Sequence, residues 1–434
     1  ACAAHLVRAG LAYPCFCSEE ELDEMSNLQR ACRERTGYRG RWAKWRDASL
    51  QKVKAALGEG KSFVIRLRAW GDYEKRISWK DGVKDAVALP ENDLDVVILK
   101  SDGQSLYHLA HAMDDHFMRI SHVIRGDEWV SSVPLHLQIF AAFDWEPPHY
   151  SHLATIQKLE EVSEVDEETG ATVTRQSKRK LSKRKDPEAN AHFYYEQGFP
   201  HLAVVEYLLN LANSDFEDWR KANPELPYQQ FEVKFGKLSS AGALADTVKL
   251  ASISRDVIGR FSREELYEQG LAWAKEFDPE TAALMERDPA FTTAALNIER
   301  FGAKPSKRIA TWTDLRPQLI WFFDEGYRAI ERFDFPAKVS AEDRRSIART
   351  FLERFTFDDT REVWFAKVKE IAKELGFATD MKEFKKNPEQ FKGSIVDVTG
   401  VLRTALSGSQ HTPDLFEVIQ VLGPERIRER LERV

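Results

Sequence analysis

The chain has 434 residues, 43% of them hydrophobic and 31% charged, with a formal net charge of −7. This composition excludes a largely disordered polymer, a small disulfide-stapled scaffold and a uniformly basic protein. The length predicts about three domains, and any nucleic acid must be bound by local groups of Lys and Arg on an acidic background.

Neither a membrane segment nor a disulfide framework is indicated. The longest apolar stretches, such as 319–323, fall far short of the ~20 residues that a spanning helix needs, and no secretory signal opens the chain. We therefore expect a cytoplasmic protein with no membrane partner. The four cysteines, Cys2, Cys15, Cys17 and Cys32, lie near the N-terminus, which fits reduced thiols better than disulfides.

The first hundred residues predict a mixture of helices and strands. Residues 3–10 have the pattern of the last turns of an amphipathic helix closing on Gly10, and residues 62–68 and 94–100 predict strands. Because the chain starts with Ala1 inside this helical pattern, we expect that a further segment precedes it in the whole protein.

The next segments predict part of a parallel sheet. A helix is expected at about 106–117, a strand at 121–125 and a second helix at about 133–143. Two extended runs then flank Thr169 and Gly170, which predicts a hairpin with an acidic tip. After residue 186 the chain is predicted to be helical to its end, with a boundary near 302–305.

The most informative segment is the run of cations that follows the hairpin. Residues 175–185 hold seven basic residues in eleven, and 180–184 read Lys-Leu-Ser-Lys-Arg. Cations on a loop after a strand can neutralise the charge that develops on a triphosphate, although a solvated basic surface or a nucleic-acid patch has the same composition. The segment resembles the second signature loop of class I aminoacyl-tRNA synthetases, in the form found in glutamyl-tRNA synthetases.

Other segments extend this resemblance over essentially the whole chain. They are 101–116, 122–129 (His-Val-Ile-Arg-Gly-Asp-Glu-Trp), 145–148, 207–213 and 412–417. The resemblance implies an α/β plus all-α fold: part of a Rossmann-type class I catalytic domain with an inserted α+β connective domain, then helical domains. The implied divisions are 1–100 (connective, acceptor-binding), 101–186 (second half of the nucleotide-binding domain, with the signature loop), 187–303 (stem contact) and 304–434 (anticodon binding).

The resemblance also implies a bacterial glutamate–tRNA ligase. Such an enzyme activates glutamate with ATP and Mg²⁺ to glutamyl-adenylate and transfers it to the 3′ end of tRNA(Glu). Arg125 occupies the position expected to pair with the substrate side-chain carboxylate, since a planar guanidinium distinguishes a carboxylate from an amide. Tyr107 corresponds to a second glutamate-binding residue, and His111 stands where many members have Asn.

The family motifs assign further residues to ATP and tRNA. Lys180 and Lys183 are the expected catalytic cations, and the ATP-binding set is Lys180, Leu181, Ser182, Lys183, Arg184, Glu128 and Trp129. A packing role is the alternative for Trp129. The tRNA-binding set is Asp115 near the 3′ end, with Arg403, Thr412, Pro413 and Leu415 at the anticodon. A capping or salt-bridging role is the alternative for Asp115.

No metal site is expected. Cys15 and Cys17 resemble the start of a zinc site that some bacterial members carry, but Trp42 stands at the place of the third ligand, and Trp does not bind zinc. The spacing of Cys32 departs from the pattern. Nine of the eleven histidines lie between His108 and His201 without metal-ligand spacing, so we expect ordinary polar or half-buried histidines.

The first class I signature, a His-x-Gly-His tetrapeptide, is absent from this sequence. We therefore expect an N-terminally truncated fragment that binds tRNA but does not form the adenylate by itself. A non-catalytic tRNA-binding paralogue is the alternative, which the intact loop and Arg125 oppose. A related enzyme that glutamylates a modified tRNA base is disfavoured by the long helical C-terminal part.

Overall fold

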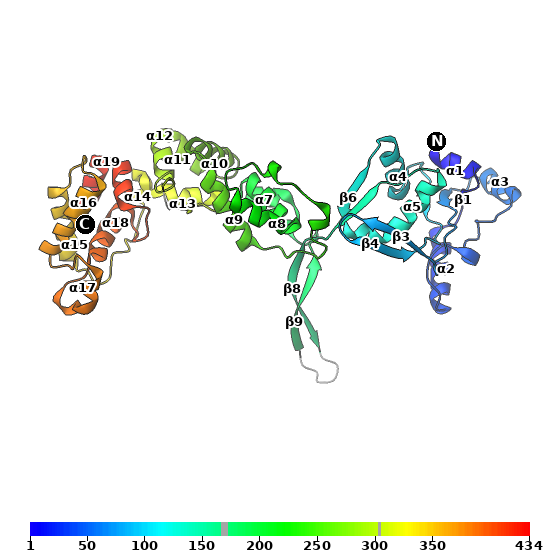
Figure 1. Ribbon diagram of the computed structural model, residues 1–434, viewed down its shortest axis with the longest axis horizontal. Helices are drawn as coiled ribbons and strands as arrows, with labels where there is room; N and C mark the ends of the chain where they lie inside the picture. Colours follow the sequence, from blue (N-terminus) through cyan, green and yellow to red (C-terminus); the bar gives the residue numbers. More distant parts are fainter. Residues whose placement is uncertain (166–171, 303–304) are drawn as a thin grey trace. The chain divides into compact units, whose positions relative to one another are not determined.

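The computed structural model describes residues 1–165, 172–302 and 305–434, which form two compact units. Unit 1 comprises Ala1–Leu181 and Leu209–Ala245, and unit 2 comprises Ser182–Leu208 and Asp246–Val434. Figure 1 shows their elements along the sequence. The predicted hairpin tip at Thr169 and Gly170 and the predicted boundary between 303 and 304 lie outside the described residues.

The first part of unit 1 is the predicted mixture of helices and strands. Three antiparallel strands pair in the order β1-β2-β5. The elements are α1 (Cys2–Arg8), β1 (Ala12–Cys15), α2 (Glu19–Ala31), α3 (Leu50–Gly58), β2 (Val64–Leu67) and β5 (Val97–Leu99). The predicted strand over 94–100 starts later, at Val97, because the Asp95 amide donates to the Tyr38 carbonyl at 2.9 Å and not to a neighbouring strand.

A hairpin that the sequence pattern does not predict lies between these strands. β3 (Arg76–Asp81) and β4 (Asp85–Pro90) pair antiparallel, and their turn packs on a later strand, β7 (His149–Leu153). The Gly82 amide donates to the Tyr150 carbonyl at 2.9 Å, and a Cβ at Gly82 would lie 2.2 Å from the Ser151 hydroxyl oxygen. A larger residue here would force the Ser151 side chain to move.

The predicted helix, strand and helix of the next segment are confirmed. They are α4 (Tyr107–Phe117), β6 (His122–Gly126) and α5 (Val133–Ala142), with the 3-10 helix η2 (Asp127–Ser132) after β6. β6 and β7 are parallel, with Arg125 opposite His152. Apolar side chains of α4, α5 and β5 form the core beneath them, including Leu109, Ile139 and Ile98.

The antiparallel hairpin of β8 (Gln157–Val165) and β9 (Thr172–Lys180) extends away from the neighbouring elements (Figure 1). The signature loop therefore starts at the end of a strand, as expected. Unit 1 also contains α8 (Asp215–Ala222) and the end of α7 (His201–Ala212).

In the described residues of unit 2 the regular secondary structure is helical, apart from one isolated bridge between Ala378 and Ser394. Besides the first part of α7, its helices are α6 (Ala191–Glu196), α9 (Thr247–Arg260), α10 (Arg263–Phe277), α11 (Pro279–Arg287), α12 (Pro289–Leu296), α13 (Leu315–Leu319), α14 (Asp324–Arg328), α15 (Ala341–Arg354), α16 (Arg361–Glu374), α17 (Met381–Lys386), α18 (Ile395–Ser407) and α19 (Leu415–Leu431). Short 3-10 helices of the whole chain are η1 (Gly40–Trp42), η3 (Pro187–Ala189), η4 (Tyr228–Gln230), η5 (Phe235–Lys237), η6 (Trp312–Asp314), η7 (Ile320–Phe322) and η8 (Pro388–Gln390).

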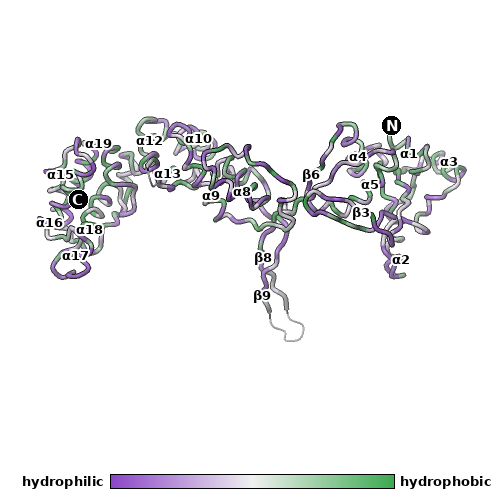
Figure 2. The backbone as a smooth tube through the Cα atoms, in the orientation of Figure 1, coloured by the Kyte–Doolittle hydropathy of each residue, from purple (hydrophilic) through white to green (hydrophobic). Residues whose placement is uncertain are grey.

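A continuous apolar core runs through unit 2, with Trp273, Leu315, Phe351 and Val401 among its buried residues. Figure 2 shows hydrophobic and hydrophilic residues interleaved along these helices, as expected where one face is buried and the other hydrated. In the part of the chain that the structure describes, no helix combines the length and the hydropathy needed to cross a membrane.

Candidate active site

Arg125 on β6 is surrounded by side chains from α4, η2, α5 and β7. Its Nε donates to His152 Nε2 at 3.0 Å, and its Nη1 donates to the Tyr107 hydroxyl at 3.3 Å. Its Nη2 contacts the Trp129 carbonyl at 3.4 Å and His136 Nδ1 at 3.3 Å. The structure therefore brings together the two residues predicted to bind glutamate, Arg125 and Tyr107, with one predicted to bind ATP, Trp129.

The charge of Arg125 fixes the protonation of the histidines around it. A guanidinium only donates, so His136 Nδ1 must accept, and its Nε2 then donates to His108 Nδ1 at 2.9 Å. His136 is fully buried, and this burial, together with the nearby His111 and Arg125, lowers its pKa to about 2. Burial also lowers the pKa of His108. These rings are therefore neutral near pH 7.

One edge of this cluster is accessible. Tyr107 is 42% exposed, and its ring lies 4.3 Å from the Trp129 ring between centroids. The Arg125 guanidinium carbon lies 4.9 Å from the centroid of the buried Tyr150 ring. Arg125 thus has a buried side, formed by His152 and Tyr150, and a side facing Tyr107 that solvent and ligands can reach.

His111 and Asp115 are held within the protein. His111 Nε2 lies 3.1 Å from the Tyr150 hydroxyl, and its Nδ1 lies 2.9 Å from Asp115 Oδ2. Burial, reinforced by Arg125, lowers the pKa of His111 to about 4, and burial raises the pKa of Asp115. His111 is therefore neutral near pH 7 and forms no salt bridge with Asp115, and the tRNA contact of Asp115 stays a prediction.

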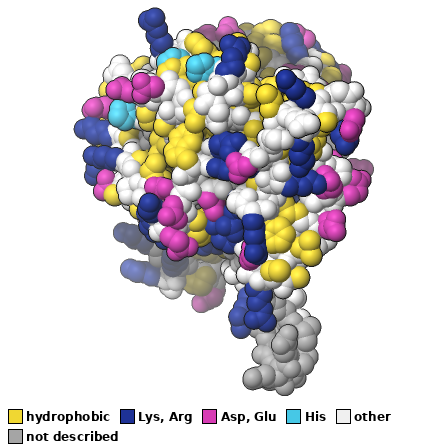
Figure 3. Space-filling model, turned by 90° about the vertical axis from the view of Figure 1, so that its right-hand side faces the viewer, with side chains coloured by type: hydrophobic (Ala, Val, Ile, Leu, Met, Phe, Trp, Pro, Cys, Tyr) yellow, Lys and Arg dark blue, Asp and Glu magenta, His cyan; other side chains and the backbone are white. Residues whose placement is uncertain are grey.

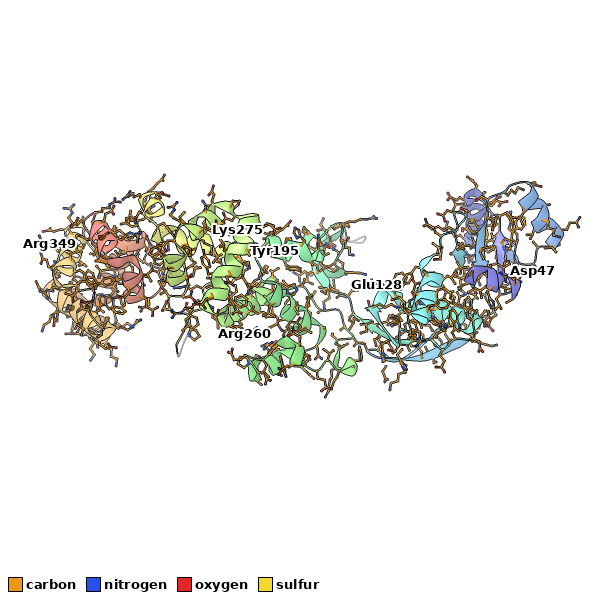
Figure 4. The ribbon with its side chains drawn as sticks, turned by 90° about the horizontal axis from the view of Figure 1, so that it is seen from above. Asp47, Glu128, Tyr195, Arg260, Lys275 and Arg349 are labelled. Atoms are coloured by element: carbon orange, nitrogen blue, oxygen red, sulfur yellow. The ribbon has the colours of Figure 1, made fainter. Side chains whose placement is uncertain are left out.

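Lys180 and Glu128, two predicted ATP-binding residues, contact each other. Lys180 Nζ lies 2.6 Å from Glu128 Oε1, and this hydrogen bond lowers the pKa of Glu128. Both side chains are partly exposed, and Figure 4 labels Glu128 at the surface. Glu128 precedes Trp129 on η2, so the predicted ATP and glutamate residues of unit 1 lie next to each other.

The signature loop crosses the division between the units, since Leu181 ends one segment of unit 1 and Ser182 begins unit 2. The Ser182 amide donates to Asp186 Oδ2 at 2.8 Å, and the Lys185 amide donates to the Ser182 carbonyl at 3.0 Å. Among the described residues, no hydrogen bond or ion pair holds the exposed Lys183 side chain. On the face drawn in Figure 3, basic side chains are dispersed among acidic ones.

The predicted anticodon residues form a second cluster, in unit 2. Arg403 Nη1 on α18 donates to the Thr412 hydroxyl at 2.6 Å and to the carbonyls of Thr412 at 3.2 Å and Pro413 at 2.5 Å. Leu415 is only 2% exposed, and Pro413 is also buried. Burial lowers the pKa of Arg403. The structure brings these four residues together, and their contact with RNA stays a prediction.

The two thiols of the predicted zinc-like segment share one partner. Cys15 Sγ and Cys17 Sγ lie 3.4 and 3.5 Å from the Tyr38 hydroxyl. A hydrogen bond from Cys17 lowers the pKa of Cys15 to about 5 despite burial. Trp42 Nε1 donates to Glu34 Oε2 at 2.8 Å. No group of three or more metal-ligating side chains is found in the described residues, and the absence of zinc stays a prediction.

Sequence reasoning missed the residues that support Arg125. His136, His152, Tyr150 and Asp81 all lie around it, directly or through one neighbour. The sequence offers one signal, the excess of histidines between His108 and His201. It does not show that they converge, because their convergence depends on the pairing of β6 with β7.

Comparison with known proteins relates both units to one group of enzymes. Residues 1–235 match the family described as tRNA synthetases class I (E and Q), catalytic domain, and residues 265–434 match the one described as anticodon binding domain. The chain is 54% identical over 428 residues to a glutamate–tRNA ligase of Sorangium cellulosum, covering 99% of this chain and 75% of the relative. It is 42% identical over 428 residues to one of Clostridium perfringens, covering 98% and 76%.

A solved structure shares the fold. The crystal structure of a glutamate tRNA ligase from Elizabethkingia meningosepticum, in complex with its amino acid, matches with a TM-score of 0.71 at 21% identity. The match covers 100% of this chain and 81% of that one.

Proposed function

Because the chain belongs to the glutamate–tRNA ligase family of class I aminoacyl-tRNA synthetases, we propose that Arg125 and Tyr107 bind the glutamate side chain and that the 180–184 loop acts on ATP. The chain combines a class I catalytic domain with an anticodon-binding domain, and its family is that of the aminoacyl-tRNA ligases that join glutamate to tRNA. The assignment of its residues is the proposal.

The proposal that Arg125 binds glutamate rests on the accessible side of its guanidinium. Its bond to His152 is 3.0 Å long, whereas those to Tyr107, Trp129 and His136 are 3.3–3.4 Å. A carboxylate on the Tyr107 side can accept charge-assisted hydrogen bonds from the guanidinium in place of the exposed Tyr107 contact, and the Tyr107 hydroxyl supplies a further donor. The amide of glutamine cannot accept through its nitrogen, so the same groups select glutamate.

ATP lies beside Lys180, Glu128 and Trp129 in this proposal. The Lys180–Glu128 ion pair is partly exposed, and an exposed pair is weak enough to exchange for a phosphate. The α-carboxylate of glutamate attacks the α-phosphorus and releases pyrophosphate, and Lys180 and Lys183 stabilise the developing charge. A ribose hydroxyl of tRNA then attacks the carbonyl carbon and releases AMP.

Magnesium accompanies ATP in this proposal and is held mainly by its phosphates. Mg²⁺ commonly binds through substrate phosphates and one or two carboxylates. The Glu128 carboxylate fits such a role, since it is accessible and its pKa is lowered by the hydrogen bond with Lys180. The ion supplies charge neutralisation of the triphosphate.

We assign tRNA(Glu) to the helical part of the chain. Its stem would lie on 187–303 and its anticodon on 304–434, and its 3′ end would reach Asp115. Arg403, Thr412, Pro413 and Leu415 support anticodon binding by shaping one packed segment, because two of them are buried. Because bacterial translation takes place in the cytoplasm, we propose that location.

Aminoacylation by the native gene product tests the proposed substrates. We expect ATP- and Mg²⁺-dependent attachment of labelled glutamate to tRNA(Glu), with glutamine used poorly. Equal use of glutamate and glutamine would overturn the glutamate assignment, and charging that does not depend on ATP would overturn the proposed reaction.

A further inference from the structure

We propose that Asp81 is a positioning residue for glutamate recognition: acting through His152, it sets the orientation of the Arg125 guanidinium. This inference rests on the glutamate-binding role proposed for Arg125. It assigns part of the substrate specificity to the β3–β4 hairpin, which contributes none of the residues predicted from family motifs.

Asp81 is buried with its carboxylate fully engaged. Its Oδ2 lies 2.5 Å from His152 Nδ1, and both side chains are inaccessible to solvent. Its Oδ1 accepts from the backbone amides of Val83 at 3.0 Å, Lys84 at 3.1 Å and His152 at 3.1 Å. One oxygen therefore holds the turn together, and the other faces the imidazole.

The charged groups at the two ends, Arg125 and Asp81, determine where the hydrogen of the His152 ring lies. Arg125 Nε can only donate, so His152 Nε2 accepts, and the ring hydrogen must sit on Nδ1, where Asp81 accepts it. Burial raises the pKa of Asp81, but hydrogen bonds from His152 and the turn amides outweigh it and leave this pKa below its usual value. Burial lowers the pKa of His152, so a neutral ring joins two charged groups.

We call the chain Asp81–His152–Arg125 the relay. It holds the buried side of the Arg125 guanidinium and leaves the other side free for the ligand. The Arg125–His152 bond is the shortest that the guanidinium makes. Because a guanidinium is planar, fixing Nε on β7 sets the plane in which Nη1 and Nη2 point. The substrate carboxylate then binds a guanidinium that is already oriented, so less binding free energy is lost in ordering it. The Gly82–Tyr150 hydrogen bond keeps the turn on β7.

Asp81→Asn tests the relay with little change of shape. The Asn oxygen can still accept from the turn amides, while its NH₂ group donates to His152 Nδ1. The hydrogen of the ring then moves to Nε2, where it opposes the Arg125 Nε–H. We expect the KM for glutamate to rise about tenfold to a hundredfold, as for a misplaced binding group, with the KM for ATP unchanged.

A matched control, Asp85, lies at the start of β4, opposite Asp81. Asp85→Asn removes the same charge from an exposed side chain at a positive φ of 59°, a conformation that Asn tolerates. We expect glutamate kinetics like those of the unmodified enzyme. A rise in the KM for glutamate equal to that of Asp81→Asn would attribute the effect to charge near the turn and overturn the relay.

His152→Asn provides a second variant should Asp81→Asn fold poorly. Its amide keeps a donor for Asp81 but is too short to replace Nε2 as the acceptor for Arg125. In the folded variant we expect the same glutamate-specific rise in KM, with the KM for ATP unchanged. If either folded variant raises the KM for ATP as much as that for glutamate, the positioning role is wrong.

Double variants separate this inference from the proposed function. Combined with Arg125→Ala, Asp81→Asn should add no further loss of glutamate over glutamine selectivity, because both changes act through one group. If Arg125→Ala alone leaves that selectivity intact, the proposed role of Arg125 fails. If Arg125→Ala abolishes it but Asp81→Asn and His152→Asn do not change it, only the present inference fails.

Discussion

Arg125 and Arg403, both singled out by the same family resemblance, have opposite environments. Arg403 directs one nitrogen at three oxygens of the Thr412–Pro413 segment, two of them 2.5 and 2.6 Å away. Arg125 makes one 3.0 Å bond to the buried His152 and three longer contacts, of which the one to the Tyr107 hydroxyl is exposed. The Nη1 group of Arg403 is engaged by its own chain, whereas Arg125 can exchange its partner on the accessible side.

This difference distinguishes an arginine that can recognise a substrate from one that stabilises the fold. A guanidinium with long, accessible contacts can take up a substrate carboxylate without breaking its anchor. One that holds two backbone carbonyls cannot leave them without exposing unsatisfied acceptors. Lys183 extends the comparison, because no hydrogen bond or ion pair to its side chain is found among the described residues. We therefore expect Arg125 and Lys183 to matter for chemistry and Arg403 for stability.

Arg125→Ala should have the largest effect. We expect kcat/KM for glutamate to fall about a thousandfold, because a substrate carboxylate is left without its charged partner, while glutamine use changes far less. Arg125→Lys should restore only part of the loss, since a point charge cannot reproduce the planar fork. The measurement is steady-state aminoacylation with both amino acids, and an equal loss for both would make Arg125 structural.

Lys183→Ala should come next. We expect adenylate formation to slow about a hundredfold, as for loss of one charge donor at a transition state, with glutamate binding little changed. Pyrophosphate exchange in the native gene product measures this rate. Lys185→Ala, which removes an exposed cation just beyond the five-residue signature, is the control. Equal rates of pyrophosphate exchange in the two variants would mean that the loop is only a basic surface.

His111→Asn should change the pH dependence of stability. In the folded protein the pKa of His111 is about 4, against 6.5 ordinarily, so the unfolded state binds a proton more readily and stability is lost as pH falls from 6.5 towards 4. At about pH 5 this loss amounts to about 2 kcal/mol. We expect the variant to show a correspondingly flatter profile in denaturant titrations. An unchanged slope would contradict the assignment of this titration to His111.

Arg403→Ala should have the smallest effect in free energy. Removing the donor to the Thr412 and Pro413 carbonyls should lower the free energy of unfolding by about 1 to 2 kcal/mol, with a secondary rise in the KM for tRNA. Denaturant unfolding and aminoacylation measure the two effects, and Arg403→Lys should be milder. Weaker tRNA binding at unchanged stability would mean that Arg403 contacts RNA directly.

Much of the fold follows from local patterns. The helix at 107–117, strand at 122–126 and helix at 133–142 match their predictions within a few residues, because hydrophobic periodicity sets them locally. The β3–β4 hairpin was missed because Asp81 is the one buried residue of its two strands, so no buried apolar face marks them in the sequence, and Gly82 matters only where its turn meets Ser151.

The four predicted functional divisions stay a proposal. Residues 209–245 group with unit 1, although the family resemblance assigns them to the stem-contact part. Contacts define compact units, whereas resemblance follows the order of motifs along the chain. The two criteria therefore answer different questions about the same residues.

The sequence by itself determined the family, the positions of the long helices and the candidate residues Arg125, Tyr107 and Lys180, because motifs and periodicity are local. Only the tertiary structure decided what surrounds Arg125. His152 is 27 residues away in sequence, and Asp81 lies 71 residues from His152. They meet because parallel pairing places β6 beside β7 and the β3–β4 turn closes over the pair, and such long-range packing leaves no periodic trace in the sequence.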